Sequence, residues 1–231
     1  MSAGRRRSIP FKLCAMPTGY LETRGLPDRS TFRPDRIMDQ LTHDDLIAPD
    51  AYEQQREAYR QTIIDLKRRR RIGLGDKITM VFENRDTLRF QIQEMIRVER
   101  IVDRQKVQDE LDVYNALLPA SGELSATLLI ELTDADTMKQ WLDLFMGLDH
   151  GQKLGLRAGG EVVYGEFEGG HSHDTKISAV HFVRFRPTSA MIAALADPAV
   201  RVALSVRHAG YEADAEVPWT MRQEWLSDLG A

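Results

Sequence analysis

The sequence predicts an α+β fold, in which a largely antiparallel sheet packs against helices in a single domain behind a flexible N-terminal leader. Helices and strands do not alternate in the strict strand–helix–strand order that a parallel sheet requires. The segment RVALSVRH (201–208) alternates apolar and polar side chains, which is typical of an antiparallel strand with one buried face. The segment 85–104 instead carries apolar residues at helical spacing.

Residues 1–37 differ in composition from the rest of the chain. They contain eight basic and three acidic residues, and neither helical nor strand periodicity persists in them. We therefore expect a flexible basic leader, followed by one domain over 38–231. We expect translation of the functional protein to start, or to start alternatively, at Met38. In that case residues 1–37 result from an incorrectly assigned upstream start. The alternatives are a disordered extension and a functional basic arm.

The domain is acidic and has no cysteine. The chain carries a net charge of −4, and because the leader carries +5, residues 38–231 carry −9. This balance argues against nucleic-acid binding, which depends on neutralising phosphates. Cys14 is the only cysteine, so the domain holds no disulfide, zinc–thiolate site, cysteine-held iron–sulfur cluster or cysteine nucleophile. No stretch of about 18 apolar residues and no signal-peptide core occurs, so we expect a cytoplasmic protein that does not span a membrane.

Three elements are predicted before residue 105. A helix spans 49–71 and is ended by the glycines of GLGD. The β-rich segment 77–83 is a buried strand, and Asn84 caps the helix 85–104 that follows. We expect the basic run 67–71 to be a solvated helix end, with an anion or nucleic-acid patch as the alternative.

The remaining apolar patterns predict further short helices and strands. In chain order they predict a helix at 107–118, a strand at 121–132, a helix at 134–151, strands at 153–158, 161–168 and 176–185, a helix at 188–195, the strand at 201–208 and a helix from Pro218.

Common catalytic motifs are absent from the sequence. GLGDK (73–77) lacks the spacing of a P-loop, and no G-x-S-x-G or H-E-x-x-H motif occurs. The single Glu-x-x-His spacing, Glu168 to His171, encloses a glycine pair, which is unfavourable in the helix that a di-iron site requires. The sequence therefore does not support a P-loop nucleotide-binding protein, an α/β-hydrolase with a nucleophile elbow, a zincin metalloprotease or a ferritin-like di-iron protein.

A first candidate site lies in GGHSHDTKISAVHF (169–182). His171, His173 and Asp174 offer imidazoles and a carboxylate to a divalent metal such as zinc, iron or manganese. The same residues are equally typical of an exposed loop. His181 shares its register with apolar residues of the strand, so a core histidine is the alternative there. No other cofactor is predicted.

A second candidate site lies on the helix 85–104, where Glu94 can meet Arg97 and Asp86 can meet Arg89. If this polar face is covered, its charged and amide groups need partners, since an unpaired buried charge costs several kcal/mol. Either these groups pair within the fold or they bind an anionic ligand through bidentate hydrogen bonds. The ligand-binding candidates are Arg89, Gln93, Glu94, Arg97, Lys176, His181 and Arg184.

Four stretches resemble the uncharacterised bacterial family known as domain of unknown function 3501: LTHDDLI (41–47), the block 69–101 around GLGDKITMVFENRDTLRFQIQEMI, DELDVYNALLP (109–119) and KISAVHFVRF (176–185). The resemblance covers Met38 to Glu216. It implies no activity and no catalytic residues. It does imply a redox or oxidative-stress setting, with rubrerythrin-like or iron–sulfur redox proteins as possible partners.

We therefore expect an accessory protein that binds a protein partner or a small anionic ligand in a redox setting. The alternative is an enzyme in which His181 and Glu94 or Glu99 act as acid–base groups, with or without a metal.

Overall fold

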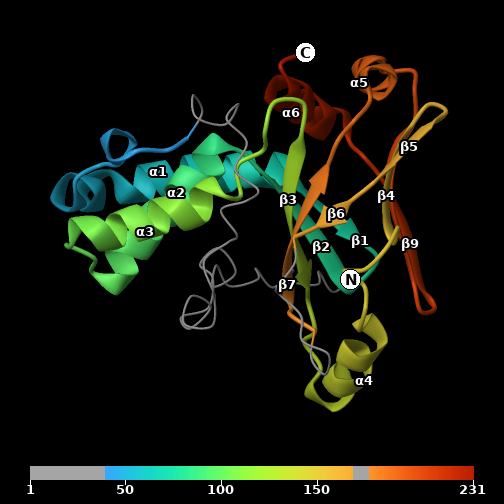
Figure 1. Ribbon diagram of the computed structural model, residues 1–231, viewed down its shortest axis with the longest axis horizontal. Helices are drawn as coiled ribbons and strands as arrows, with labels where there is room; N and C mark the ends of the chain where they lie inside the picture. Colours follow the sequence, from blue (N-terminus) through green and yellow to red (C-terminus); the bar gives the residue numbers. More distant parts are fainter. Residues whose placement is uncertain (1–39, 169–176) are drawn as a thin grey trace, which may run out of the picture.

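The computed structural model describes residues 40–168 and 177–231, which form two antiparallel sheets and a separate layer of helices (Figure 1). The first sheet has the strand order β1-β2-β3-β7-β6 and the second has the order β5-β4-β8-β9. The strands are β1 Arg71–Leu74, β2 Ile78–Glu83, β3 Leu124–Ile130, β4 Leu154–Ala158, β5 Glu161–Tyr164, β6 Glu166–Phe167, β7 Val180–Phe185, β8 Val202–His208 and β9 Tyr211–Glu216.

The helices of the described chain lie beside the sheets and at their ends. A short 3-10 helix, His43–Asp45, precedes them. The α-helices are α1 Pro49–Arg69, α2 Arg85–Glu99, α3 Arg104–Asn115, α4 Ala135–Phe145, α5 Ser189–Ala196 and α6 Trp219–Leu229. None of the helices in the described part is long and apolar enough to cross a bilayer.

The two sheets enclose one hydrophobic core. Alternate residues of β3 and β8 point into it, as the sequence pattern predicts, because side chains of a strand alternate between its two faces. The buried residues concerned are Leu124, Ala126, Leu128 and Ile130 of β3 and Val202, Leu204 and Val206 of β8.

The sheets are joined along both edges. Gly165 lies where the chain passes from β5 in the second sheet to β6 in the first. A Cβ atom at this position would lie 2.6 Å from Val183 Cγ1, so glycine is required there. On the other edge, the hydroxyl of Tyr211 in β9 donates a hydrogen bond to the carbonyl of Leu74 in β1 (2.6 Å).

Helices α6 and α4 close opposite ends of the core (Figure 1). The Trp225 ring of α6 packs on Phe82 with 4.4 Å between centroids. The Phe145 ring of α4 packs edge-on against Tyr211 at 5.1 Å.

Helices α1, α2 and α3 form a layer on the outside of the first sheet (Figure 1). Phe182 of β7 joins a second apolar cluster with this layer, whereas Val183 and Phe185 belong to the core between the sheets. Strand β7 therefore has one face towards the helices and the other towards the core. The helical part of the second cluster consists of Leu88, Ile92, Ile96, Leu111 and Tyr114.

The predicted α+β class with antiparallel strands is confirmed, and so are two predicted helix caps. The Thr87 N–H donates to Asn84 Oδ1 (3.0 Å), and the Asp136 N–H donates to Asp134 Oδ1 (3.0 Å).

The predicted end of the helix 85–104 was wrong, because α2 stops at Glu99. Arg100 has a left-handed backbone (φ 52°). The Ile101 N–H then bonds to the Ile96 carbonyl (2.9 Å), which is the Schellman arrangement that ends a helix. Apolar residues continue past Arg100 at helical spacing, so the apolar periodicity alone did not reveal the C-terminus of α2.

Three strand assignments also differ from the expectation. The segment 161–168 is two strands in different sheets, because the chain turns at Gly165. Strands β1 and β9 were not predicted; β9 has an exposed face rich in acidic residues and β1 is four residues long, so neither shows a strong apolar pattern.

Candidate functional site

Glu94 of α2 lies in a cluster with α1. Its carboxylate accepts hydrogen bonds from the Tyr52 hydroxyl and from Nε and Nη2 of Arg56, each at 2.8 Å, and from Arg97 Nε at 3.2 Å. Burial alone would raise the pKa of Glu94, but the bonds from Arg56 and Tyr52 outweigh it and lower the pKa to about 2. Glu94 is therefore ionised at neutral pH and is a poor proton donor or acceptor.

The neighbouring candidates on α2 have similar internal partners. Arg89 donates to the Tyr59 hydroxyl (3.1 Å) and to Asp86 (3.1 Å), and its guanidinium lies over the Tyr59 ring. The side-chain amide of Gln93 bonds to both the N–H and the carbonyl of Ile47, each at 2.9 Å. Gln93 thereby ties the segment before α1 to α2.

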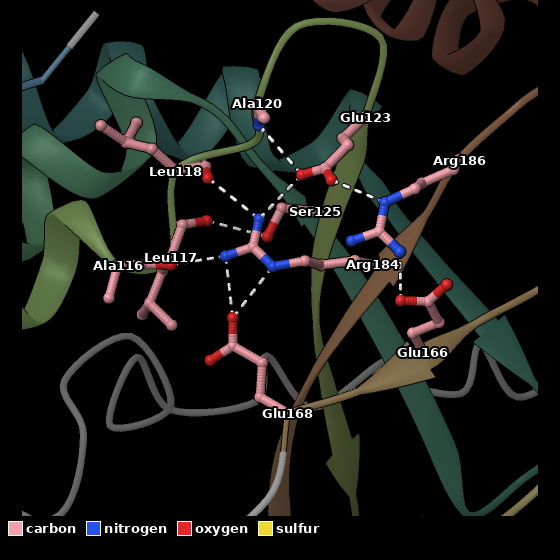
Figure 2. A network of polar contacts seen from close by, with 10 residues as sticks. All are labelled: Ala116, Leu117, Leu118, Ala120, Glu123, Ser125, Glu166, Glu168, Arg184 and Arg186. Atoms are coloured by element: carbon pink, nitrogen blue, oxygen red, sulfur yellow. Dashed lines mark hydrogen bonds and ion pairs between the residues drawn. The ribbon is translucent and has the colours of Figure 1, made fainter. Parts of the chain in front are cut away.

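Arg184 of β7 lies at the centre of a buried polar network (Figure 2). Its guanidinium donates to the carbonyls of Ala116 and Leu118, the latter at 3.0 Å. It also donates to the carboxylates of Glu123 (3.2 Å) and Glu168 (2.8 Å). The carbonyls follow the C-terminus of α3, where helical carbonyls lack intrahelical donors and a cation is favoured.

Glu123 extends this network to a second arginine. Its other oxygen accepts from Arg186 Nε at 2.8 Å, and Arg186 also pairs with Glu166 (Figure 2). Burial opposes ionisation of Glu123, but the Ala120 N–H and the two arginines more than compensate and lower its pKa. The network joins the loop after α3 to β3, β6 and β7.

His181 is fully buried on the core-facing side of β7, together with Val183 and Phe185. Its Nε2 lies 2.8 Å from the Ser178 carbonyl, so Nε2 is the donor, and its ring meets Phe167 edge-on. Burial lowers the pKa of His181, although Asp149 and the Ser178 carbonyl act in the opposite direction.

The structure does not bring the predicted acid–base groups together. Glu94 bonds to residues of α1 and α2. His181 lies on the opposite face of β7 from Phe182, the residue of this strand that contacts the helical layer. Arg184, three residues after His181, also lies on the helical side.

The predicted metal ligands His171, His173 and Asp174, and the ligand candidate Lys176, lie outside the described residues. Within 40–168 and 177–231, no three His, Cys, Asp or Glu side chains are grouped so that they could hold a metal ion.

A cavity of about 280 Å³ lies beside α4, between this helix and Ile177. One face of α4 and the residue after it supply most of the lining, which is largely apolar. The lining residues are Ala135, Met138, Lys139, Leu142, Asp143, Met146 and Ile177.

A family model described as "Protein of unknown function (DUF3501)" matches residues 40–229. The chain belongs to this family. The match extends beyond Glu216 and includes α6, which the resemblance of the four stretches did not cover.

A solved structure of a novel protein of unknown function from Burkholderia pseudomallei is similar to this DUF3501 domain. The two are 32% identical, with a TM-score of 0.75, and the match covers 82% of this chain and 99% of the other. No curated protein matches the chain.

Several residues of the DUF3501 domain that complete these clusters were missed by sequence reasoning. Tyr52 and Arg56 lie at helical spacing on one stripe of the predicted first helix, but this spacing does not indicate that the stripe meets Glu94. Glu123, Glu168 and Arg186 come from separate strands and loops, and no sequence spacing indicates that they meet.

The basic run 67–71 was expected to be a solvated helix end, and this is only partly correct. Arg70 is buried and pairs with Glu224 (3.0 Å) and Asp228 (2.6 Å) of α6. Arg68 and Arg69 remain largely exposed. The run therefore anchors the C-terminal helix at its buried arginine.

Proposed function

We propose that this DUF3501 protein is an accessory protein that binds a protein partner in a redox setting. One observation carries the proposal: the described candidate groups that could react or bind a small anion are engaged in internal contacts. Glu94 has partners on two helices, and Arg184 is surrounded by two carboxylates and two carbonyls.

The same contacts favour a macromolecular partner over a small anionic ligand. An anion that competed for Arg184 would have to displace Glu123 and Glu168 from a buried site, leaving their carboxylates without that partner. Binding through the outer surface requires no such rearrangement. Acid–base catalysis by His181 with Glu94 or Glu99 has less support, because Glu94 has a pKa of about 2 and His181 faces the core.

The redox setting rests on the family resemblance, and cysteine usage limits what this domain itself contributes to it. Residues 38–231 contain no cysteine, so this domain supplies no thiol and no cysteine-held cluster. In the proposed complex, electron transfer is therefore the chemistry of the partner, and the DUF3501 domain supplies binding and positioning.

Calorimetric titration and size-exclusion chromatography test the proposal. The untagged full chain is mixed with a purified rubrerythrin-like protein and, separately, with a purified iron–sulfur redox protein from the same organism. We expect saturable binding and co-elution with at least one of them. Absence of heat and of co-elution with both proteins would contradict the proposed function.

A further inference from the structure

The corner between α2 and α3 combines exposed apolar side chains with unpaired positive charge. Val102 is 92% exposed and Val98 is 51% exposed. Arg100, Arg104 and Lys106 are exposed around them, and their side chains form no ion pair within the part of the chain that the structure describes. We define the α2–α3 corner as Val98, Arg100, Val102, Arg104 and Lys106.

The position of this corner in the fold favours contact with another molecule. Helix α2 leaves the first sheet after β2 and α3 returns to it before β3, so their connection lies at the far end of the pair (Figure 1). Ile101 packs into the apolar cluster of the helical layer and holds the turn in place. The corner is thus anchored at one residue while its neighbours point outwards.

Folding does not account for the residues at the corner. A side chain that is 92% exposed, as Val102 is, contributes almost nothing to the hydrophobic core. Arg100 occupies a left-handed position (φ 52°) that glycine or asparagine adopts with less strain. Neither feature stabilises the part of the chain that the structure describes.

The basic residues of the corner indicate that a partner would present an acidic surface. The segment 97–106 contains four basic and two acidic residues, in a domain whose overall charge is −9. Because Arg97 pairs with Glu94, the exposed charges of this segment are the basic Arg100, Arg104 and Lys106 and the acidic Glu99 and Asp103, an excess of one positive charge. An acidic surface on another protein is thus attracted to this corner and repelled by most of the remaining domain.

We propose that the α2–α3 corner is the surface through which this protein docks an acidic protein, by placing Val98 and Val102 against an apolar patch ringed by carboxylates. The inference rests on the proposed function and specifies its binding surface. A protein fits better than an anionic membrane, because surface-binding helices insert aromatic or leucine side chains and the segment 97–106 has none.

The test measures binding of the purified rubrerythrin-like and iron–sulfur proteins to the full chain and to three variants. Val102→Asp places a carboxylate against the partner's carboxylates, and Arg104→Glu reverses one charge of the rim. The matched control is Val162→Asp, since Val162 is also an exposed valine (42%) but lies on β5, on the other side of the molecule (Figure 1).

We expect Val102→Asp to weaken binding at least tenfold, because a buried valine accounts for about that factor. Arg104→Glu weakens it less and flattens its dependence on ionic strength. Val162→Asp leaves it unchanged. All three variants keep the thermal midpoint of the wild type, which shows that binding and not folding has changed.

Other outcomes overturn the inference and separate it from the proposed function. Equal binding by wild type and both corner variants shows that the partner uses another surface, while the proposed function stands. If neither protein binds the wild type, the proposed function and the inference both fall. Vesicles of phosphatidylglycerol that bind the wild type and not Val102→Asp, with no protein bound, assign the corner to a lipid surface instead.

Discussion

Two arginine-rich regions of the molecule lie at opposite ends of α3 and behave in opposite ways. After the C-terminus of α3, Arg184 is buried and meets two carboxylates and two carbonyls (Figure 2). At the opposite end of α3, Arg100 and Arg104 are exposed and form no ion pair with described residues. The contrast shows that the number of charges in a segment does not reveal their role; the partners that the fold supplies do.

The stability of the two regions should differ accordingly, and Arg184→Met tests the larger effect. This change leaves the buried Glu123 and the half-buried Glu168 without the guanidinium between them, so we expect a loss of about 3–5 kcal/mol in the free energy of unfolding. Urea denaturation measures it.

The matched control for this change is Arg104→Met, an equivalent substitution at the exposed corner. It should alter the free energy of unfolding by less than about 0.5 kcal/mol. If Arg184→Met were as mild as its control, the buried network would not be the stabilising feature described above.

A second prediction concerns the pH dependence due to Glu94. Its pKa in the folded protein is about 2, below the value of 4.5 for an unperturbed glutamate. Its contribution is therefore complete above pH 4.5 and is lost as the pH falls towards 2. We expect Glu94→Gln to cost about 2 kcal/mol at pH 7, as for hydrogen bonds to a charged group.

The difference between wild type and Glu94→Gln should shrink as the pH falls from 4.5 to 2. Urea midpoints of both proteins across this range measure it, with Asp86→Asn as a control for a more exposed carboxylate on the same helix. A difference that stays constant with pH would show that the glutamine acts through packing and not through charge.

The smallest expected effect is a gain in stability at the corner. Arg100→Gly removes the strain of a left-handed non-glycine residue at the end of α2, and we expect about 0.5–1 kcal/mol of added stability. Thermal or urea unfolding measures it. Arg104→Gly, inside the first turn of α3, should instead destabilise by a similar amount, because glycine is unfavourable within a helix. A loss of stability in Arg100→Gly would mean that the arginine side chain makes a contact that outweighs the strain.

Sequence patterns were most reliable where local geometry decides the outcome. The alternation in β8 and the capping residues Asn84 and Asp134 act within a few residues of chain, so they identified the elements correctly. The stop of α2 at Arg100 was missed because it depends on one left-handed residue inside a continuing apolar pattern.

The candidate site could be predicted only in part. The pairing of Glu94 with Arg97 follows from helical spacing, which brings residues three apart together. Tyr52 and Arg56 join them from α1, about 40 positions earlier, through the packing of two helices. The candidate Arg184 was identified, but its carbonyl and carboxylate partners were not.

The sequence alone determined the α+β class, most helices and strands, the family and the absence of cysteine chemistry from residues 38–231. These follow from composition and from side-chain periods of two and 3.6 residues. Tertiary structure decided that the strands divide into two sheets at Gly165, that Arg184 is enclosed, and that the α2–α3 corner is left open. The reason is physical: the environment of a charge depends on atoms distant in sequence, and only packing brings them near.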